Sequence, residues 1–60
     1  MEFSDTELAA CARRELAQRK RVYPRLVSEG KMDQKTAEVE IRMMARIAEF
    51  FEARTQPRLL

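Results

Sequence analysis

The chain has 60 residues, of which 45% are hydrophobic and 37% are charged, and its net charge is +2. This composition is too apolar for a disordered chain, and no apolar run approaches the ~18 residues that a transmembrane helix needs. Cys11 is the single cysteine and histidine is absent, which excludes an internal disulfide, a Cys/His zinc site and a catalytic triad that uses His.

A first helix is predicted after Ser4-Asp5-Thr6-Glu7, which has the pattern of a capping box. The segment from residue 8 to residue 20 is rich in Ala, Leu, Arg and Gln, which favours helix. Pro24 has no N–H to continue that helix. We therefore expect a break at Val22-Tyr23 and a short helical turn from Pro24 to Glu29.

A turn and a second helix follow. Gly30, the one glycine of the chain, is expected to end the short helix at positive φ, and Asp33 is a natural N-cap. The second helix should run from Gln34 to about Ala53, since this stretch has no Gly or Pro. The predicted fold class is all-α: an antiparallel two-helix hairpin as a single domain over residues 1–54, with a flexible C-terminal tail over residues 55–60.

The second helix has an apolar face that spans roughly 200°, wider than the ~100° that one packed neighbour requires. A 60-residue chain buries only about 60% of its unfolded surface. We therefore expect the surplus face to join two copies into a helical bundle, although the short helix and the tail would cover it in a monomer. The predicted oligomer-interface residues are Ile41, Met43, Met44, Ile47, Phe50 and Phe51.

Three charged residues fall near the expected interface between the helices: Glu15, Arg19 and Glu40. They either pair through solvent at its edge or form a partly buried cluster that fixes the register. Glu15 and Glu40 as paired catalytic carboxylates are disfavoured, because an arginine between them favours an ion pair over a raised carboxyl pKa. With no phosphate-binding loop or metal motif either, we predict no enzyme activity, no cofactor and no metal.

Basic residues concentrate in the middle of the chain, where residues 13–35 carry eight basic and three acidic side chains. The Arg13–Arg25 stripe is a solvated face, a phosphate-binding surface for nucleic acid, or a surface for an acidic protein. As the surface for a protein partner we predict Arg14, Arg21, Tyr23, Arg25 and Leu26. Cys11 is expected to be a small buried apolar residue, with a reactive thiol beside Arg14 as the alternative.

The segment from Arg14 to Met44 carries the pattern R-x-x-V-Y-P-R-x-V-x-x-G-x-M over residues 19–32, preceded by Arg14-Glu15-Leu16 and followed by Ala37, Glu40-Ile41 and Met44. In this pattern the chain resembles a family of small, largely uncharacterised proteins of tailed phages and prophages of proteobacteria. The resemblance covers about half of the chain and implies a phage-derived accessory protein in the bacterial cytoplasm, without an activity. Its expected partners are a second copy and a host or phage protein, and we expect no membrane partner and no signal peptide.

Overall fold

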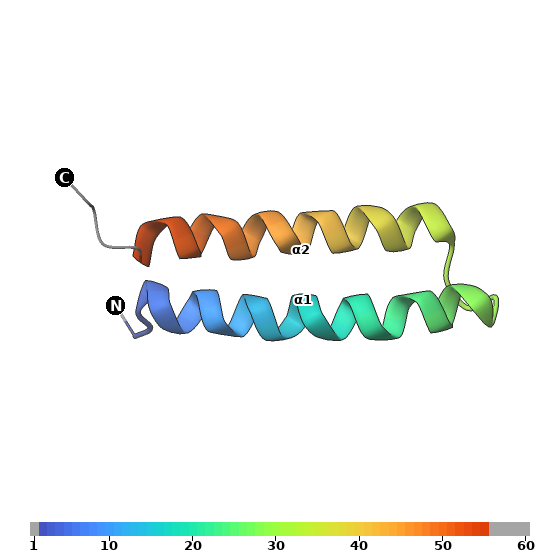
Figure 1. The fold of residues 1–60 in the computed structure, drawn as a ribbon, viewed down its shortest axis with the longest axis horizontal. Coiled ribbons are helices and arrows are strands. Elements are labelled where there is room, and N and C mark those ends of the chain that lie inside the picture. The colour runs from blue at the N-terminus through green and yellow to red at the C-terminus, as the bar shows by residue number, and fades with distance from the viewer. Residues whose placement is uncertain (1, 56–60) are drawn as a thin grey trace.

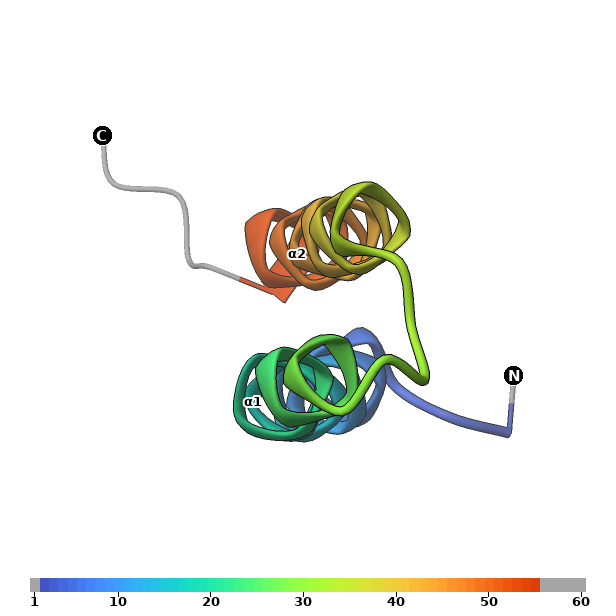
Figure 2. The same ribbon diagram turned by 90° about the vertical axis from the view of Figure 1, so that its right-hand side faces the viewer.

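A computed structural model describes residues 2–55 of the protein, which form two helices connected by a short turn. Helix α1 spans Asp5–Ser28 and helix α2 spans Gln34–Thr55. The two lie side by side and antiparallel, so that the start of α1 and the end of α2 are at the same end of the hairpin (Figures 1 and 2). The described residues contain no strand. The predicted all-α hairpin is confirmed.

The start of α1 is fixed by the predicted capping box. The backbone N–H of Glu7 donates to Ser4 Oγ at 3.1 Å, and the backbone N–H of Ser4 donates to Glu7 Oε1 at 2.9 Å. Two of the N–H groups that a helix start leaves unpaired are thereby satisfied. Asp5 and Glu7 also place negative charge at the positive end of the helix dipole.

The expected break at Val22-Tyr23 is wrong, because α1 continues through Pro24 to Ser28. A proline inside a helix removes one backbone hydrogen bond, here the one that Lys20 C=O would accept. The last turn keeps its own bonds: Glu29 N–H donates to Arg25 C=O at 2.9 Å, and the carbonyls of the next two residues accept from the turn. The turn from Pro24 and its end at Gly30 were predicted, but the one bond lost at Pro24 does not separate that turn from the rest of α1.

The turn between the helices has the geometry predicted from its glycine. Gly30 has φ of +75°, and its N–H donates to Val27 C=O while Lys31 N–H donates to Leu26 C=O. These two bonds make a Schellman motif, which requires the left-handed conformation that glycine adopts without strain. Asp33 Oδ2 then accepts from the N–H groups of residues 35 and 36, as expected of an N-cap.

Helix α2 ends two residues later than predicted. Thr55 is its last residue, and Thr55 Oγ1 donates to Glu52 C=O at 2.9 Å. The predicted tail therefore does not include residue 55, and the rest of it, residues 56–60, lies outside the described residues.

Alanine is the most frequent side chain in the seam between α1 and α2, and four of its six buried residues are alanines. Ala12, Leu16, Met44 and Ala48 form its central cluster, with Ile41 and Ala45 packed against it. Ala9 and Ala37 extend the buried set along the two helices. Alanines let two backbones approach closely, but each buries little apolar surface. The hairpin is therefore held by a thin core.

Candidate interaction surfaces

The outer side of α2 exposes large apolar side chains. Met43 is 48% exposed, Ile47 46% and Phe50 58%. Spacings of four and three residues place these three on one side of a helix. We call these three residues the outer apolar stripe. Exposed apolar side chains that gather in this way mark surfaces that bind other molecules.

A shallow hollow lies along the outer apolar stripe. It has a volume of about 400 Å³ and is lined by Val39, Arg42, Met43, Arg46 and Ile47. Beside it the rings of Phe50 and Phe51 meet edge to face, with centroids 5.2 Å apart, and the Arg54 guanidinium lies 5.6 Å from the Phe50 ring centroid. The hollow has the size and the chemistry to receive an apolar side chain from a facing surface.

The six predicted interface residues divide into three groups. The three of the outer apolar stripe are exposed, Ile41 and Phe51 are half-buried, and Met44 is buried in the seam. Met44 follows the 4-3 spacing of Ala37, Ile41 and Ala48, which is the side that packs on α1. This placement corrects its assignment to the surface available to a second copy.

The structure brings together the three charged residues Glu15, Arg19 and Glu40. Arg19 Nε donates to Glu15 Oε2 at 3.0 Å, and Arg19 Nη1 donates to the backbone carbonyl of Glu40 at 2.9 Å and lies 3.6 Å from Glu40 Oε1. The hydrogen bond with Glu15 is the main reason that the pKa of Arg19 is raised above its usual value. The Arg19 side chain is 21% exposed. It links the two helices at one edge of the seam.

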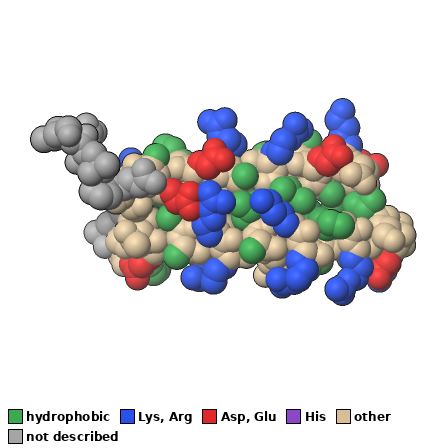
Figure 3. Space-filling view, in the orientation of Figure 1, with side chains coloured by type: hydrophobic (Ala, Val, Ile, Leu, Met, Phe, Trp, Pro, Cys, Tyr) green, Lys and Arg blue, Asp and Glu red, His purple; other side chains and the backbone are tan. Residues whose placement is uncertain are grey.

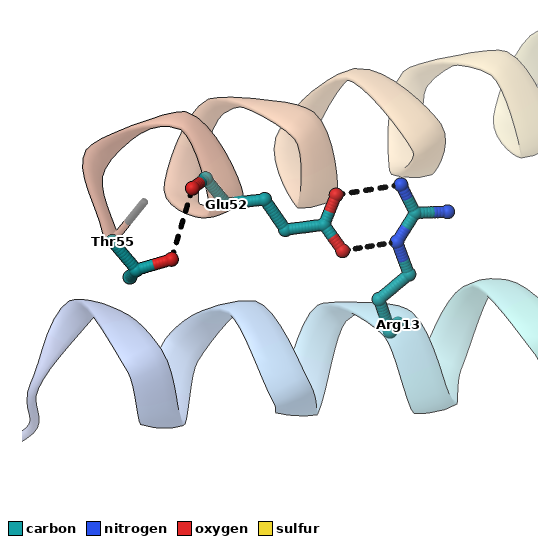
Figure 4. A network of polar contacts seen from close by, with 3 residues as sticks. All are labelled: Arg13, Glu52 and Thr55. Carbon is teal, nitrogen blue, oxygen red and sulfur yellow. Dashed lines mark hydrogen bonds and ion pairs between the residues drawn. The ribbon is translucent and has the colours of Figure 1, made fainter. Parts of the chain in front are cut away.

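Two further ion pairs across the seam were not predicted. Arg13 donates to both carboxylate oxygens of Glu52, with the Nη2–Oε1 distance 2.7 Å, and Arg54 Nε donates to Asp5 Oδ2 at 3.0 Å (Figure 4 shows the first pair). The bond from Arg13 lowers the pKa of Glu52, and the bond to Glu52 raises the pKa of Arg13. These four charged residues were visible in the sequence, but pairing them required the register of α1 against α2.

The predicted protein-partner surface does not form one face. Arg14, Arg21 and Arg25 are exposed, and their spacing of seven and four residues places them on one side of α1. Tyr23 is half-buried and lies two residues, or about 200°, from both of its arginine neighbours. Its ring lies 5.9 Å from the Arg19 guanidinium. Leu26 is half-buried as well.

The basic side of α1 remains as a surface of its own. Among residues 2–55, Arg14, Arg21 and Arg25 take part in no ion pair, whereas Arg13 and Arg19 are both bound by glutamates. Lys and Arg side chains follow the outer edges of both helices (Figure 3). A row of unpaired arginines can bind phosphate or carboxylate groups.

Cys11 is exposed, which corrects the expectation that it is buried. The seam uses Ala9, Ala12 and Leu16, and Cys11 lies about 100° from Ala12 around α1. It lines an open hollow of about 520 Å³ together with Phe3, Leu8 and Arg14, among others.

Within residues 2–55, no three Cys, Asp or Glu side chains are grouped so as to hold a metal ion. Neither α1 nor α2 is long and apolar enough to cross a membrane. Comparison with protein-family models, curated proteins and solved structures finds no match for this chain.

Proposed function

We propose that this protein is a non-catalytic accessory protein of phage or prophage type, which acts in the cytoplasm of a bacterial host by binding proteins. Its first partner is a second copy of itself, bound through the outer apolar stripe. The resemblance in residues 14–44 supports the phage-type origin. The exposure of Met43, Ile47 and Phe50 is the observation that carries the binding function.

The contrast between the seam and the stripe supports this proposal. The seam buries four alanines, one leucine and one methionine, while three larger apolar side chains of α2 remain about half exposed. Complete burial of a large apolar side chain contributes about 1.5–3 kcal/mol. A facing apolar surface therefore gains much of the burial energy that the hairpin itself leaves unused.

Sedimentation equilibrium at tens of micromolar tests the proposal. We expect the wild-type chain to sediment as a dimer of its 7.1 kDa monomer. Ile47→Asp places a charge in the centre of the stripe and should give a monomer, partly or wholly unfolded, because small dimers seldom keep a stable folded monomer. Gln18→Asp, at an exposed position of α1, is the matched control and should stay dimeric. A wild-type chain that sediments as a single 7.1 kDa species contradicts the proposal.

A second candidate function, nucleic-acid binding, is favoured by the unpaired arginines of α1. Three exposed arginines on one side of a helix can contact backbone phosphates, which would make the affinity fall with salt at a log–log slope of about three. We expect no binding to duplex DNA or RNA that survives ~150 mM salt, since base stacking would need aromatic residues that this side lacks. Tight binding at that salt, abolished by Arg14→Ala with Arg21→Ala, would establish this second function instead.

A further inference from the structure

We infer that the second copy packs against both helices, on the broad face of the hairpin where the outer apolar stripe of α2 lies beside Leu8, Val22 and Leu26 of α1. We call the stripe and these three residues together the shared apolar face. Two hairpins joined through this face form a four-helix bundle. The inference rests on the proposed function, because it requires that a second copy covers the stripe, and it adds the contribution of α1 to that interface.

The edge of the seam at Arg19 fixes the side of the hairpin on which the outer apolar stripe lies. Arg19 of α1 and Glu40 of α2 meet at this edge, where Arg19 Nη1 lies 3.6 Å from Glu40 Oε1. Met43 follows Glu40 by three residues and Ile47 follows it by seven, and both spacings return to the same side of a helix. The stripe therefore lies next to the Arg19 edge of the seam.

Helix α1 continues the apolar surface across the same edge. Leu8 and Val22 lie seven residues before and seven residues after Glu15, which accepts the hydrogen bond from Arg19 at 3.0 Å. Leu26 lies seven residues after Arg19, so all three apolar residues share the side of α1 that carries this cluster. All three are half-buried. Packing within the hairpin thus leaves apolar surface from both helices on one face.

The opposite broad face of the hairpin carries more charge. The ion pair of Arg13 with Glu52 spans the two helices there. Lys20 follows Arg13 by seven residues and Glu49 precedes Glu52 by three, and both of these side chains are exposed. A second copy on that face would remove these charges from water, which is costly without matched partners. The shared apolar face is therefore the favoured site of association.

The area that a stable dimer needs also favours an interface that includes both helices. A standard interface buries about 800 Å² on each partner. The three side chains of the outer apolar stripe, each of roughly 200 Å² and about half exposed, offer only about 300 Å². Contact through α2 alone therefore falls short, and the half-buried residues of α1 provide the apolar surface that adjoins the stripe.

The thin core of the hairpin favours a second copy as the occupant of the shared apolar face. Four of the six buried residues are alanines, and a chain of this size gains little stability from one small core. A partner that adds burial stabilises the fold only where it accompanies the chain, and a second copy always does. A two-fold axis brings the shared apolar face of one copy onto that of the other, so apolar surface meets apolar surface.

Aspartate in the first turn of α1 gives a matched pair of variants. Leu8→Asp places a charge within the shared apolar face, whereas Thr6→Asp adds the same charge at an exposed position about 160° away around the helix. A negative charge near the start of a helix is compatible with its dipole in both variants. Leu8→Asp should weaken dimerisation by about tenfold or more, and Thr6→Asp should change it by about twofold at most. Sedimentation equilibrium measures both affinities, with circular dichroism to verify helix content.

Alkylation of Cys11 by iodoacetamide in the wild-type chain gives a second measurement, which requires no substitution in the face. Cys11 is exposed in the hairpin and lies three residues after Leu8, on the same side of α1. Its reaction rate at a fixed excess of reagent should fall as the protein concentration rises through the dissociation constant of the dimer. If Leu8→Asp loses its helix content, this rate alone decides.

The outcomes separate the role of α1 from the existence of the dimer. A dimeric wild type in which Cys11 reacts at one rate at all concentrations, or in which folded Leu8→Asp and Thr6→Asp dimerise equally well, overturns the contribution of α1 and leaves a homodimer through α2 standing. A wild type that stays monomeric overturns the shared interface together with the proposed function.

Discussion

The two sides of α2 differ in the size of the apolar residues that they carry. The side that packs on α1 buries Ala37, Met44 and Ala48, with Ile41 packed against them, whereas the neighbouring side, about 100° round the helix, exposes Met43, Ile47 and Phe50. A chain that folded for its own stability alone would place its larger apolar side chains in the seam. The distribution in this protein therefore leaves three large apolar side chains of α2 outside the seam, where the proposed second copy would cover them.

The seam and the outer apolar stripe also differ in the ion pairs formed by the charged residues beside them. Charged pairs close the seam on its edges, through Arg13 with Glu52 and Arg19 with Glu15 and Glu40. The outer apolar stripe is bordered by Arg42, which has no ion pair within residues 2–55, and by Arg46, which contacts only the exposed Glu49 of its own helix, at 3.8 Å. The two borders therefore differ: charged contacts across the helices close the seam, whereas neither Arg42 nor Arg46 forms an ion pair with α1 in the part of the chain that the structure describes.

The largest expected effect on stability comes from truncating one aliphatic side chain of the seam, and it is compared with the same change in the outer apolar stripe. Leu16→Ala removes the largest aliphatic side chain of the seam, which is 3% exposed, and should lower the free energy of unfolding by about 2–5 kcal/mol. Ile47→Ala removes a half-exposed side chain and should lower the stability of the hairpin itself by about 1 kcal/mol or less. Its main effect should be on the dissociation constant of the dimer.

Urea unfolding at several protein concentrations distinguishes these outcomes. The loss caused by Leu16→Ala should be the same at all concentrations at which the chain is monomeric. The loss caused by Ile47→Ala should grow with concentration, as the wild type gains a dimer that the variant forms less well. Equal losses for both variants at low concentration would mean that the stripe belongs to the core of the monomer.

Local signals in the sequence predicted the ends of the two helices. The capping box at Ser4, the positive φ of Gly30 and the N-cap Asp33 each depend on a few neighbouring residues, and all three are present in the structure. The break at Pro24 was a local prediction too, but it failed, because the hydrogen bonds that close α1 at Gly30 keep the last turn helical.

Features that depend on contacts between the helices were harder to predict. The wide apolar face of the second helix was evident, but its division into a buried side with Met44 and an exposed side with Met43 required the position of α1. The pairing of Arg13 with Glu52 joins residues 39 positions apart and was not predicted, whereas the contact of Arg19 with Glu40 was, because an antiparallel hairpin brings the end of the first helix beside the start of the second. Arg19 was placed correctly beside Glu15 because those two are one helical turn apart.

A smaller effect is expected at the half-buried edge of the seam. Arg19→Ala removes the bonds to Glu15 and to the Glu40 carbonyl and should lower the free energy of unfolding by about 1 kcal/mol, since part of the site is open to solvent. Arg21→Ala is the matched control two residues away, on the exposed side of α1, and should change stability little. Thermal unfolding of both variants followed by circular dichroism measures the difference, and equal midpoints would show that the Arg19 cluster contributes nothing to the seam.

The smallest effect concerns the exposed edge of the seam and appears only as a dependence on pH. The pKa of Glu52 in the folded chain is lowered from its ordinary value of 4.5, chiefly by the hydrogen bond from Arg13. The carboxylate therefore stabilises the fold at pH values above its unfolded pKa, and this contribution is lost as the pH falls through the lower folded pKa. We expect the wild type to be more stable than Glu52→Gln at pH 6, with the two stabilities drawing together on acidification below about pH 4.5. Asp33 and Asp5 remain unchanged in both proteins, so the difference between the two urea-unfolding curves isolates Glu52. A difference that stays constant from pH 6 to pH 3 would show that the Arg13 pair does not depend on the charge of Glu52, and that the edge of the seam is held by packing alone.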